Sequence, residues 1–356
     1  MHKSTVYVKV PKKQGEKTIA LANKLGLFDK SLGIQREELH LCIPLLRQPD
    51  DNEFKTLKSQ VPETQLSARF FAEKQPAAKT LNQVLKNKLP PHLAASLPKA
   101  LDVVGDIVII EIPPVLKAYE NVIGEAILQT HRNIRTVLAK ASAVSGLHRV
   151  RDFAFIAGEN KTQTIHREFG CQFHVDVAKA YFSPRLSHEH QRVASLVQDD
   201  EVVVDMFAGV GPFSVLIAKR KPNVRVYAVD INPDAVELLK VNARLNRVEN
   251  RVFPIVGDSR QIIKNRLKGS ADRVIMNLPE TAIEFVDAAC QAIKPQGGII
   301  HFYAFVRHPD SIENLKMRFS QAVESAGKEV DAFIQVRSVR ETAPYESQIV
   351  LDAKIA

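Results

Sequence analysis

Residues 203–213 read Val203-Val204-Asp205-Met206-Phe207-Ala208-Gly209-Val210-Gly211-Pro212-Phe213, and Val226-Tyr227-Ala228-Val229-Asp230 follows them. In the first stretch, an apolar β-branched run gives way to two glycines, a proline and a helical pattern. The second stretch is another apolar run, and it ends on a carboxylate. This succession predicts the first βαβ unit of a doubly wound sheet. Its glycines let the backbone approach a ligand, and its acid accepts a pair of ribose hydroxyls.

The glycine spacing narrows the class of cofactor. A dinucleotide fingerprint requires a third Gly or Ala three residues after the second glycine, and this chain has Ser214 there. The stretch from Asp205 to Gly211, an acid followed by Gly-x-Gly, is instead typical of S-adenosylmethionine-dependent methyltransferases. We therefore predict S-adenosylmethionine as the cofactor, with a nicotinamide site or a purely structural turn as the alternatives.

Length and composition set the broad class of protein. At 356 residues the chain exceeds what one core usually holds, so two or three domains are expected. No apolar run approaches a membrane span, and Met1 to Val6 lack a signal-peptide stretch, so we expect a cytoplasmic protein. The three cysteines are far apart in the sequence and have no metal-ligand spacing, which fits a reducing compartment. The net charge of +9 favours a polyanionic partner.

The pattern along the chain predicts three domains, over residues 1–72, 73–185 and 186–356, with a hinge in the connector 71–80. The first is a small α/β unit with strands at 5–10 and 38–45 and a helix at 15–25. The second is an α+β domain. Its expected elements are short helices at 81–88 and 91–97, a buried strand at 103–112, helical spacing over 116–138, and strands at 150–157 and 163–177.

The third domain alternates strands and helices, which predicts a Rossmann-like, mostly parallel sheet of seven strands. Its expected strands are 202–207, 225–231, 252–257, 272–278, 298–305, 329–339 and 348–355. Its expected helices are 213–220, 233–245, 261–267, 281–293 and 311–326. The last two strands are joined by a short link, which predicts an antiparallel edge.

Polar residues follow the first four strands of this sheet, where the ligand of an open α/β sheet binds. They are Asp205, Asp230, Asp258 with Ser259, and Asn277. Asp230 suits the ribose diol, and Asp258 suits the adenine amino group. Ordinary polarity of strand ends is the alternative interpretation.

The segment Met276-Asn277-Leu278-Pro279-Glu280 indicates the acceptor. A side-chain amide beside a proline-stiffened turn can accept a hydrogen bond from the N–H of a planar substrate. Enzymes that methylate nitrogen on a flat base or amide often have Asn/Asp-Pro-Pro-aromatic here. This chain has Leu278 and Glu280 in place of the first proline and the aromatic, and a strand that simply ends at Pro279 is the alternative.

Four segments together resemble the archaeal and eukaryotic tRNA (guanine-37, N1)-methyltransferase family, in order from about residue 100 to 356. They are Ala157-Gly158-Glu159-Asn160-Lys161-Thr162-Gln163-Thr164-Ile165-His166-Arg167-Glu168, then Val175-Asp176-Val177-Ala178-Lys179-Ala180-Tyr181-Phe182-Ser183-Pro184-Arg185-Leu186, then Val204 to Phe213, then Met276-Asn277-Leu278-Pro279. The first 70 residues match only loosely, as the family's domain that binds the tRNA elbow.

The resemblance implies roles for individual residues. Glu189 would be the general base for the guanine N1 proton, and Arg149 the partner of O6, with Asn277 and Pro279 holding the base. A carboxylate serves as this base if its neighbours raise its pKa. The implied cofactor contacts are Tyr181, His190, Asp205, Phe207, Gly209, Gly211, Asp230, Ile231, Asp258, Ser259 and Asn277. No metal is expected, since His188 and His190 do not converge on one helix face.

Each assignment has a structural alternative. Glu189 could be a capping or surface acid, Arg149 could contact a phosphate only, and Tyr181 could pack in the core. The segment 131–168, in which Lys and Arg outnumber Asp and Glu, would hold the anticodon loop, although a solvated face has the same composition. An enzyme that modifies N1 must extrude the base from the loop.

Two related activities remain as alternatives at this stage. One is a dual enzyme that also methylates a tricyclic wyosine precursor at carbon. The other is the aminocarboxypropyl transferase of wyosine biosynthesis, whose members lack the Asn-Leu-Pro segment found at 277–279. The resemblance implies a monomer with tRNA as its partner, and it leaves the role of Arg185 open.

Overall fold

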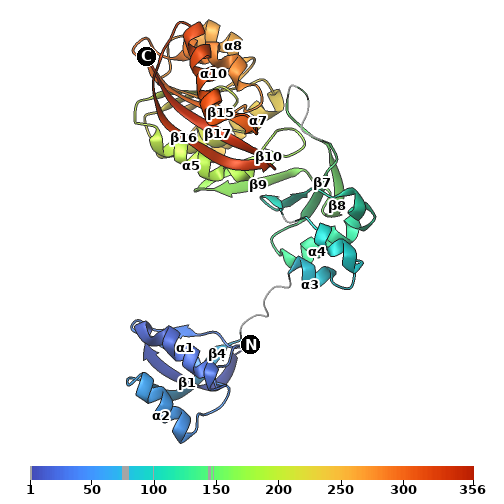
Figure 1. Cartoon of the computed structure of the whole chain (residues 1–356), viewed down its shortest axis with the longest axis vertical. Helices are drawn as coiled ribbons and strands as arrows, with labels where there is room; N and C mark the ends of the chain where they lie inside the picture. Colours follow the sequence, from blue (N-terminus) through green and yellow to red (C-terminus); the bar gives the residue numbers. More distant parts are fainter. Residues whose placement is uncertain (1, 74–79, 99, 143–145, 147) are drawn as a thin grey trace. The chain divides into compact units, whose positions relative to one another are not determined.

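The computed structural model describes residues 2–73, 80–98, 100–142, 146 and 148–356. The chain divides into two compact units, Met1–Thr80 and Leu81–Ala356 (Figure 1). Strand β4 ends at Ala72, where the first domain was expected to end. The predicted hinge falls largely on residues 74–79, outside the described residues.

The N-terminal unit is a four-stranded antiparallel sheet with two helices. Its strand order is β2 (Gln35–Arg36), β3 (His40–Pro44), β1 (His2–Pro11) and β4 (Gln65–Ala72). Helix α1 (Gly15–Lys24) lies close to its predicted bounds, whereas helix α2 (Asp51–Gln60) was missed. The signal for α2 was a capping box, in which Asp50 and Glu53 each accept from the other's backbone N–H.

The second unit begins with a small sheet ordered β5 (Asp102–Val104), β6 (Ile107–Ile110), β7 (Thr136–Lys140) and β8 (Phe153–Gly158). Helices α3 (Leu81–Leu85) and α4 (Glu120–Thr130) and the 3-10 turns η2 (Pro91–Ser96) and η3 (Pro114–Tyr119) accompany it. Side chains from α3 and α4 share an apolar cluster with β6 and β7, so the two helices cover the sheet.

Two predictions in this region were wrong. The run 103–112 is a hairpin and not one strand, because Gly105 adopts φ +57° and turns the chain between β5 and β6. The helical spacing over 116–138 ends at Thr130, and the residues from Thr136 form the buried strand β7.

The predicted strand 163–177 is likewise a hairpin, of β9 (Gln163–Glu168) and β10 (Cys171–Asp176). Phe169 and Gly170 have φ of +45° and +79°, which makes the tight turn. The free edge of β10 is paired by two side-chain amides at the end of helix α7 (Pro233–Leu245). Asn242 exchanges hydrogen bonds with the backbone of His174, and Asn246, the residue after the helix, with that of Gln172. The β9–β10 hairpin therefore packs on α7, and the expected domain boundary between residues 185 and 186 does not separate this hairpin from the residues that follow it.

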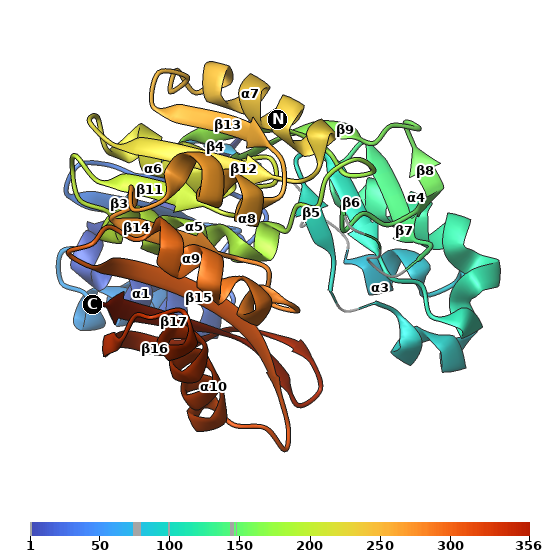
Figure 2. The same ribbon diagram turned by 90° about the horizontal axis from the view of Figure 1, so that it is seen from above.

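The main sheet has the predicted seven strands, and their order is β13-β12-β11-β14-β15-β17-β16 (Figure 2). The first five are parallel, and β17 pairs antiparallel with β15 and β16. The strands are β11 (Val202–Asp205), β12 (Arg225–Asp230), β13 (Val252–Val256), β14 (Arg273–Met276), β15 (Gly298–Arg307), β16 (Val330–Ala343) and β17 (Glu346–Ile355).

Helices cover both faces of this sheet. One apolar cluster joins it to α5 (Ser187–Leu196), α6 (Pro212–Arg220) and α7 (Pro233–Leu245). The other joins it to the π-turn η5 (Ile263–Leu267) that continues α8 (Ser259–Ile262), and to α9 (Val286–Ala292) and α10 (Ile312–Ser325). A 3-10 turn, η6 (Ala282–Phe285), leads into α9, and η4 (Pro184–Leu186) leads into α5. The ligand edge of the sheet is thus held between two packed layers.

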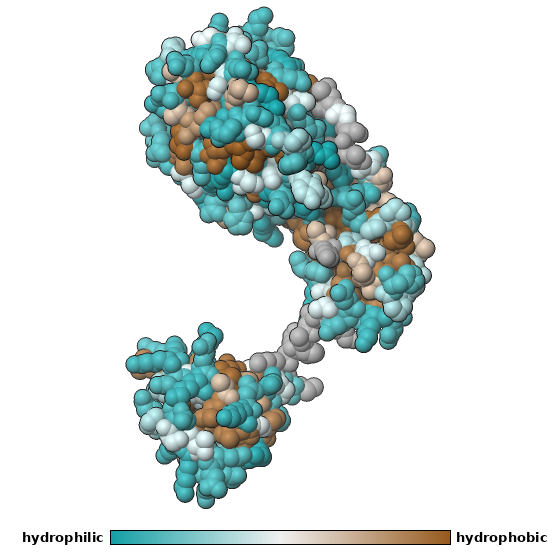
Figure 3. All heavy atoms as spheres, in the orientation of Figure 1, coloured by the Kyte–Doolittle hydropathy of each residue, from teal (hydrophilic) through white to brown (hydrophobic). Residues whose placement is uncertain are grey.

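Hydrophilic side chains predominate on the face of each unit that Figure 3 shows. None of the helices in the described parts of the chain is long and apolar enough to cross a membrane.

The hydrogen bonds that Asn242 and Asn246 make with the backbone of β10, here called the amide clamp, predict that one substitution strongly lowers stability. Asn242 is fully buried and satisfies His174 N–H, His174 C=O and Val210 C=O, so Asn242→Ala leaves buried backbone groups without partners. We expect the free energy of unfolding to fall by about 2–4 kcal/mol. Urea unfolding checks this, with Glu237→Ala on the exposed side of α7 as a control that loses less than about 0.5 kcal/mol. Equal effects of the two variants would contradict the clamp.

Candidate active site

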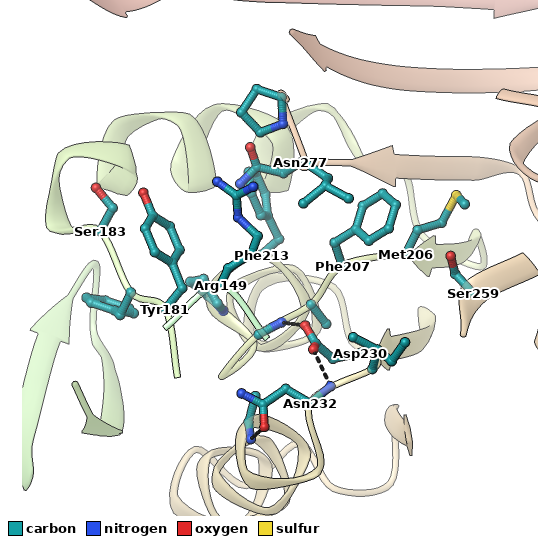
Figure 4. A pocket seen from close by; sticks show the side chains of 18 of the residues that line it. Arg149, Tyr181, Ser183, Met206, Phe207, Phe213, Asp230, Asn232, Ser259 and Asn277 are labelled. Carbon is teal, nitrogen blue, oxygen red and sulfur yellow. Dashed lines mark hydrogen bonds between the residues drawn. The ribbon is translucent and has the colours of Figure 1, made fainter. Parts of the chain in front are cut away.

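A cavity of the second unit lies where the parallel strands β11, β12 and β14 end. Figure 4 shows Asn277 and Asp230 on opposite sides of it, with Arg149, Phe213 and Phe207 between them. Its walls come from the loops after these strands, from the segment that precedes α5, from the turn that carries Arg149, and from β15, β16 and β17. The cavity is therefore lined both by the turn next to the small sheet β5–β8 and by the region of the seven-stranded sheet.

The loop after β11 is shaped by its glycines. Gly209 and Gly211 have φ of +55° and +88°, a conformation that L side chains rarely adopt. A Cβ on Gly211 would also lie 2.1 Å from Leu239 Cδ1, so close packing of α7 excludes a side chain there. Pro212 then occupies the first turn of α6.

Asp230 ties this loop to the end of β12. Its carboxylate accepts hydrogen bonds from the N–H groups of Gly209 (2.6 Å) and Asn232 (2.9 Å) (Figure 4). Burial raises the pKa of Asp230, and the backbone hydrogen bonds oppose the shift. Each oxygen holds one backbone donor and retains a lone pair, which fits a ribose diol in the cavity.

The end of the cavity where the adenine is expected is formed by Asp258, Ser259 and an aromatic wall. Asp258 lines the cavity and caps α8 by accepting from Arg260 N–H at 2.8 Å. The Ser259 hydroxyl is buried and has no partner in the described chain, so a polar ligand group could satisfy it. Phe207 packs edge-to-face on Phe285 at 5.0 Å, which gives an apolar surface for a flat base.

The acceptor side contains a guanidinium that is already paired. Arg149 donates two hydrogen bonds to Glu280, at 2.6 and 2.9 Å, and its φ is +54°. Its charge lies 5.9 Å from the Tyr181 ring. Asn277 Oδ1 accepts from Gln348 at 3.2 Å, which turns the amide oxygen to a fixed position beside Pro279.

Glu189 is near this cavity but not among its lining residues. It is buried on α5, and its carboxylate accepts hydrogen bonds from Arg192, Tyr303 and Arg337. Burial raises its pKa, but these donors outweigh burial and leave the pKa below the ordinary value. The condition that neighbours raise the pKa of this carboxyl is therefore not met in the free protein.

His190, the next residue, does line the cavity. Its Nδ1 is 2.7 Å from a carboxylate oxygen of buried Glu168, and its ring packs edge-to-face on Phe213 at 4.6 Å. The carboxylate thereby fixes the orientation of the imidazole.

The structure brings most of the predicted site residues together. The lining residues include Arg149, Tyr181, His190, Phe207, Gly209, Asp230, Ile231, Asp258, Ser259, Asn277 and Pro279. Glu189, Asp205 and Gly211 do not line the cavity. For Asp205 and Gly211 the structure shows contacts that support the loop, and their expected cofactor contact stays a prediction. Asp205 is fully buried and accepts from the Ser214 hydroxyl at 2.7 Å, while Gly211 starts α6.

Several residues of the site were not found from the sequence. Glu280 and Gln348 pair with Arg149 and Asn277, and Arg340 lines the cavity from β16. Glu280 was visible only as a departure from the usual aromatic, and the other two carried no motif. Among the described residues, no cluster of three or more His, Cys, Asp or Glu side chains could hold a metal ion.

Comparison with protein families matches three successive segments of the chain. The TRM5/TYW2 methyltransferase domain matches residues 164–331, the TYW2 N-terminal domain residues 81–162, and the tRNA methyltransferase 5 N-terminal domain residues 8–54. The division between the first two models falls before the β9–β10 hairpin, in agreement with the packing of that hairpin on α7.

Relatives cover the whole chain. The tRNA (guanine(37)-N(1))-methyltransferase Trm5b of Pyrococcus abyssi is 40% identical over 99% of both chains. The solved complex of aTrm5 and tRNALeu has a TM-score of 0.72 and 35% identity, covering 99% of this chain and 100% of that one.

Two further relatives bear on cofactor and activity. Methanocaldococcus jannaschii Trm5 in complex with adenosine has a TM-score of 0.64 and 34% identity, over 98% and 99% of the two chains. A tRNA(Phe) (4-demethylwyosine(37)-C(7)) aminocarboxypropyltransferase of the same organism is 34% identical, but over only 70% of this chain and 96% of its own.

The buried Asp205 predicts a pH-dependent stability. Burial raises its pKa from 3.8 to about 7. Its contribution to stability is therefore complete below 3.8, and it is lost as the pH rises through about 7. Since Asn cannot titrate, Asp205→Asn should gain stability relative to the unmodified chain as the pH rises from about 4 to about 7, by about 1.4 kcal/mol per pH unit within that window, with no further gain above it. Urea unfolding at these pH values checks this, and a difference that does not change with pH would contradict it.

Proposed function

The chain belongs to the tRNA (guanine-37, N1)-methyltransferase family, and we propose that its cavity joins the methyl donor and the acceptor base. It transfers the methyl group of S-adenosylmethionine to N1 of guanine 37 in tRNA. One observation carries the proposal: Gly209 and Asp230 line the same cavity as Arg149, Asn277 and Pro279. A cofactor half and a base-binding half thus share one space.

In the cofactor half, Asp230 would hold the ribose hydroxyls and Ile231 would pack beside them. Asp258 and Ser259 would meet the adenine, and Phe207 would pack against its face. Gly209 lets the backbone approach the ligand, and Tyr181 and His190 would lie toward its sulfonium end. S-adenosylmethionine supplies an electrophilic methyl group, and these residues bind it and orient that methyl toward the acceptor.

In the acceptor half, the chemistry concerns a proton and a developing charge. Guanine N1 carries a proton at neutral pH, and negative charge grows on O6 as that proton leaves. Arg149 would exchange Glu280 for O6, because a fixed guanidinium stabilises such an oxygen best where water is excluded. Asn277 and Pro279 would hold the plane of the base.

We assign proton removal from N1 to Glu189. It is the carboxylate on α5 next to the cavity residue His190, and it is hydrogen-bonded to Tyr303, whose ring packs beside cavity residue Phe213 at 6.1 Å. The low pKa of Glu189 in the free protein makes it a poor base there, so binding of RNA must change its surroundings.

The N-terminal unit would contact tRNA at the elbow, away from the chemistry. Support comes from the match of residues 8–54 to the tRNA methyltransferase 5 N-terminal domain. A monomer in the cytoplasm is part of the same proposal. The aminocarboxypropyl transferase alternative is disfavoured, because the relative of that name matches only 70% of this chain.

The activity is tested by methyl transfer from labelled S-adenosylmethionine to unmodified tRNA transcripts that carry G37 or A37. We expect label on the G37 transcript and at least about 100-fold less on A37, since adenine has no N1 proton to remove and no O6 to stabilise. Equal labelling of both transcripts, or none of either, would overturn the proposal. Mass analysis for a 3-amino-3-carboxypropyl adduct separates the sister activity.

The role of Glu189 is tested by Glu189→Gln, which keeps the shape and removes the base. We expect kcat to fall by about 100- to 10,000-fold, with cofactor affinity nearly unchanged. Single-turnover methyl transfer measures the loss, and titration calorimetry with S-adenosylhomocysteine measures the affinity. Full turnover by this variant would remove Glu189 from the mechanism.

A further inference from the structure

Glu189 lies one row of side chains below the floor of the cavity. In the antiparallel strands β15, β17 and β16 (Figure 1), Phe305, Gln348 and Arg340 form one cross-strand row, and all three line the cavity. The next row contains Tyr303, Val350 and Arg337. It lies two residues along β15 and β17, and three residues along β16, where a register shift between Ser338 and Arg340 adds one residue.

Tyr303 and Arg337 are also the two strand residues that donate to Glu189. The proposed base is therefore held by the row immediately beneath the site.

The three donors to Glu189 are not equally fixed. Tyr303 is fully buried. The Arg192 side chain is 15% exposed and also donates to Asp352 at 2.5 Å and to Gln335 at 2.9 Å. Arg337 differs from both. Its side chain is 37% exposed, and its buried Nε has no partner in the described part of the chain. Arg337 is thus the donor that can leave at the least cost.

The two oxygens of Glu189 differ accordingly. Oε1 accepts from Tyr303 and from Arg192, both at 2.6 Å. Oε2 accepts from Arg337 and, at 3.0 Å, from Arg192 Nε. A carboxylate that accepts a proton needs an accessible lone pair, and departure of Arg337 provides one on Oε2.

The remaining network keeps Glu189 in place when Arg337 leaves. Arg273 donates to His301 Nε2 at 2.8 Å, so His301 is neutral and donates from Nδ1 to Asp352 at 2.6 Å. Asp352 in turn accepts from Arg192, which binds both oxygens of Glu189. This series of hydrogen bonds is buried beneath α5 and does not involve Arg337.

We propose that Arg337 is a positioning residue that caps Oε2 of Glu189 in the free enzyme and moves onto a backbone phosphate of the bound RNA. The inference rests on the proposed role of Glu189 as the base. Arg340, at the rim of the cavity, lies one row from Arg337, about 7 Å along the sheet face. A planar guanidinium matches phosphate with two parallel hydrogen bonds, so RNA at the rim competes with the single bond to Glu189.

The step then balances as follows. The N1–H bond breaks and an Oε2–H bond forms, while the N1 electron pair attacks the methyl carbon. The S–CH₃ bond breaks, and its electrons stay on sulfur in the leaving S-adenosylhomocysteine. Departure of Arg337 takes a positive charge away from the side of the Glu189 carboxylate at the moment when this carboxylate must accept the proton.

The groups that face Glu189 predict how its titration responds. They are Arg192 on its own helix, Tyr303 from β15 and Arg337 from β16, with Asp352 of β17 and His301 of β15 behind Arg192. Burial raises the pKa of Tyr303 well above its ordinary value and lowers that of His301. Glu189 is then the member of this set whose pKa responds directly to Arg337.

The experiment compares pH profiles of Arg337→Met with those of the unmodified chain, using intact tRNA. The acid limb of kcat/KM reports the free enzyme, and that of kcat reports the complex. We expect the acid limb of kcat/KM to move up by about one pH unit and that of kcat to stay in place, because in the complex Arg337 has already left. The slope of log KM against log salt should fall by about 0.7.

Two controls make the result specific. Arg225→Met removes the same charge from an exposed position at the start of β12, the end of that strand opposite Asp230, and should leave both limbs unchanged. Arg337→Lys keeps the charge and should move the kcat/KM limb by less than about half a unit. If the Met variant does not fold, Arg337→Gln replaces it, because this variant also removes the charge.

Each remaining outcome overturns the proposal. If the acid limbs of both kcat/KM and kcat shift in Arg337→Met, Arg337 stays on Glu189 in the complex. If neither acid limb shifts, Arg337 does not set the pKa of Glu189. A Glu189→Gln variant that keeps the acid limb would instead show that Glu189 is not the base. That failure belongs to the proposed function and is recognised without any Arg337 variant.

Discussion

The hydrogen bond from Gly209 N–H to the Asp230 carboxylate, 2.6 Å long, is the contact on which the site depends. It joins the loop after β11 to the end of β12, and it forms only because these strands are parallel neighbours. Gly209 can donate because its φ of +55° turns its N–H toward the carboxylate, and Gly211 lets α6 start close against α7. The cradle of the cofactor is thus a consequence of sheet order, and Asp205 supports it from the buried side by accepting from Ser214.

The acceptor half has a different origin, because its residues come from parts of the chain outside the first βαβ unit. Arg149 precedes β8, Asn277 follows β14, and Gln348 comes from the antiparallel strand β17. Its reactive ions are already paired: Arg149 with Glu280, and Glu189 with Arg192 and Arg337. A desolvated charge without a partner is costly, so such pairing keeps the site folded before RNA arrives. In the proposed mechanism the substrate replaces a partner of each ion, which would link binding to activation.

The alternation of strands and helices after residue 200 predicted the seven-stranded sheet, because long periodic segments and glycine turns are local signals. Errors arose where two consecutive strands were predicted as one: only the positive φ of Gly105 and of Phe169 with Gly170 divides 103–112 and 163–177. The gathering of Asp230, Asp258 and Asn277 at one cavity could be predicted because each lies at or just after the end of a strand. The partners of the catalytic ions could not, since Tyr303, Arg337 and Asp352 meet Glu189 and Arg192 only through strand register and burial beneath α5.

The central claim is that one cavity brings the sulfonium methyl to the Watson–Crick edge of guanine 37. Primer extension across tRNA treated with the enzyme and S-adenosylmethionine tests it most directly, because a methyl group on N1 blocks pairing with the incoming nucleotide. The account predicts a stop directly before position 37 that requires both cofactor and enzyme. Methyl incorporation without a stop at that position would place the modification on another atom or another base, and would contradict the account.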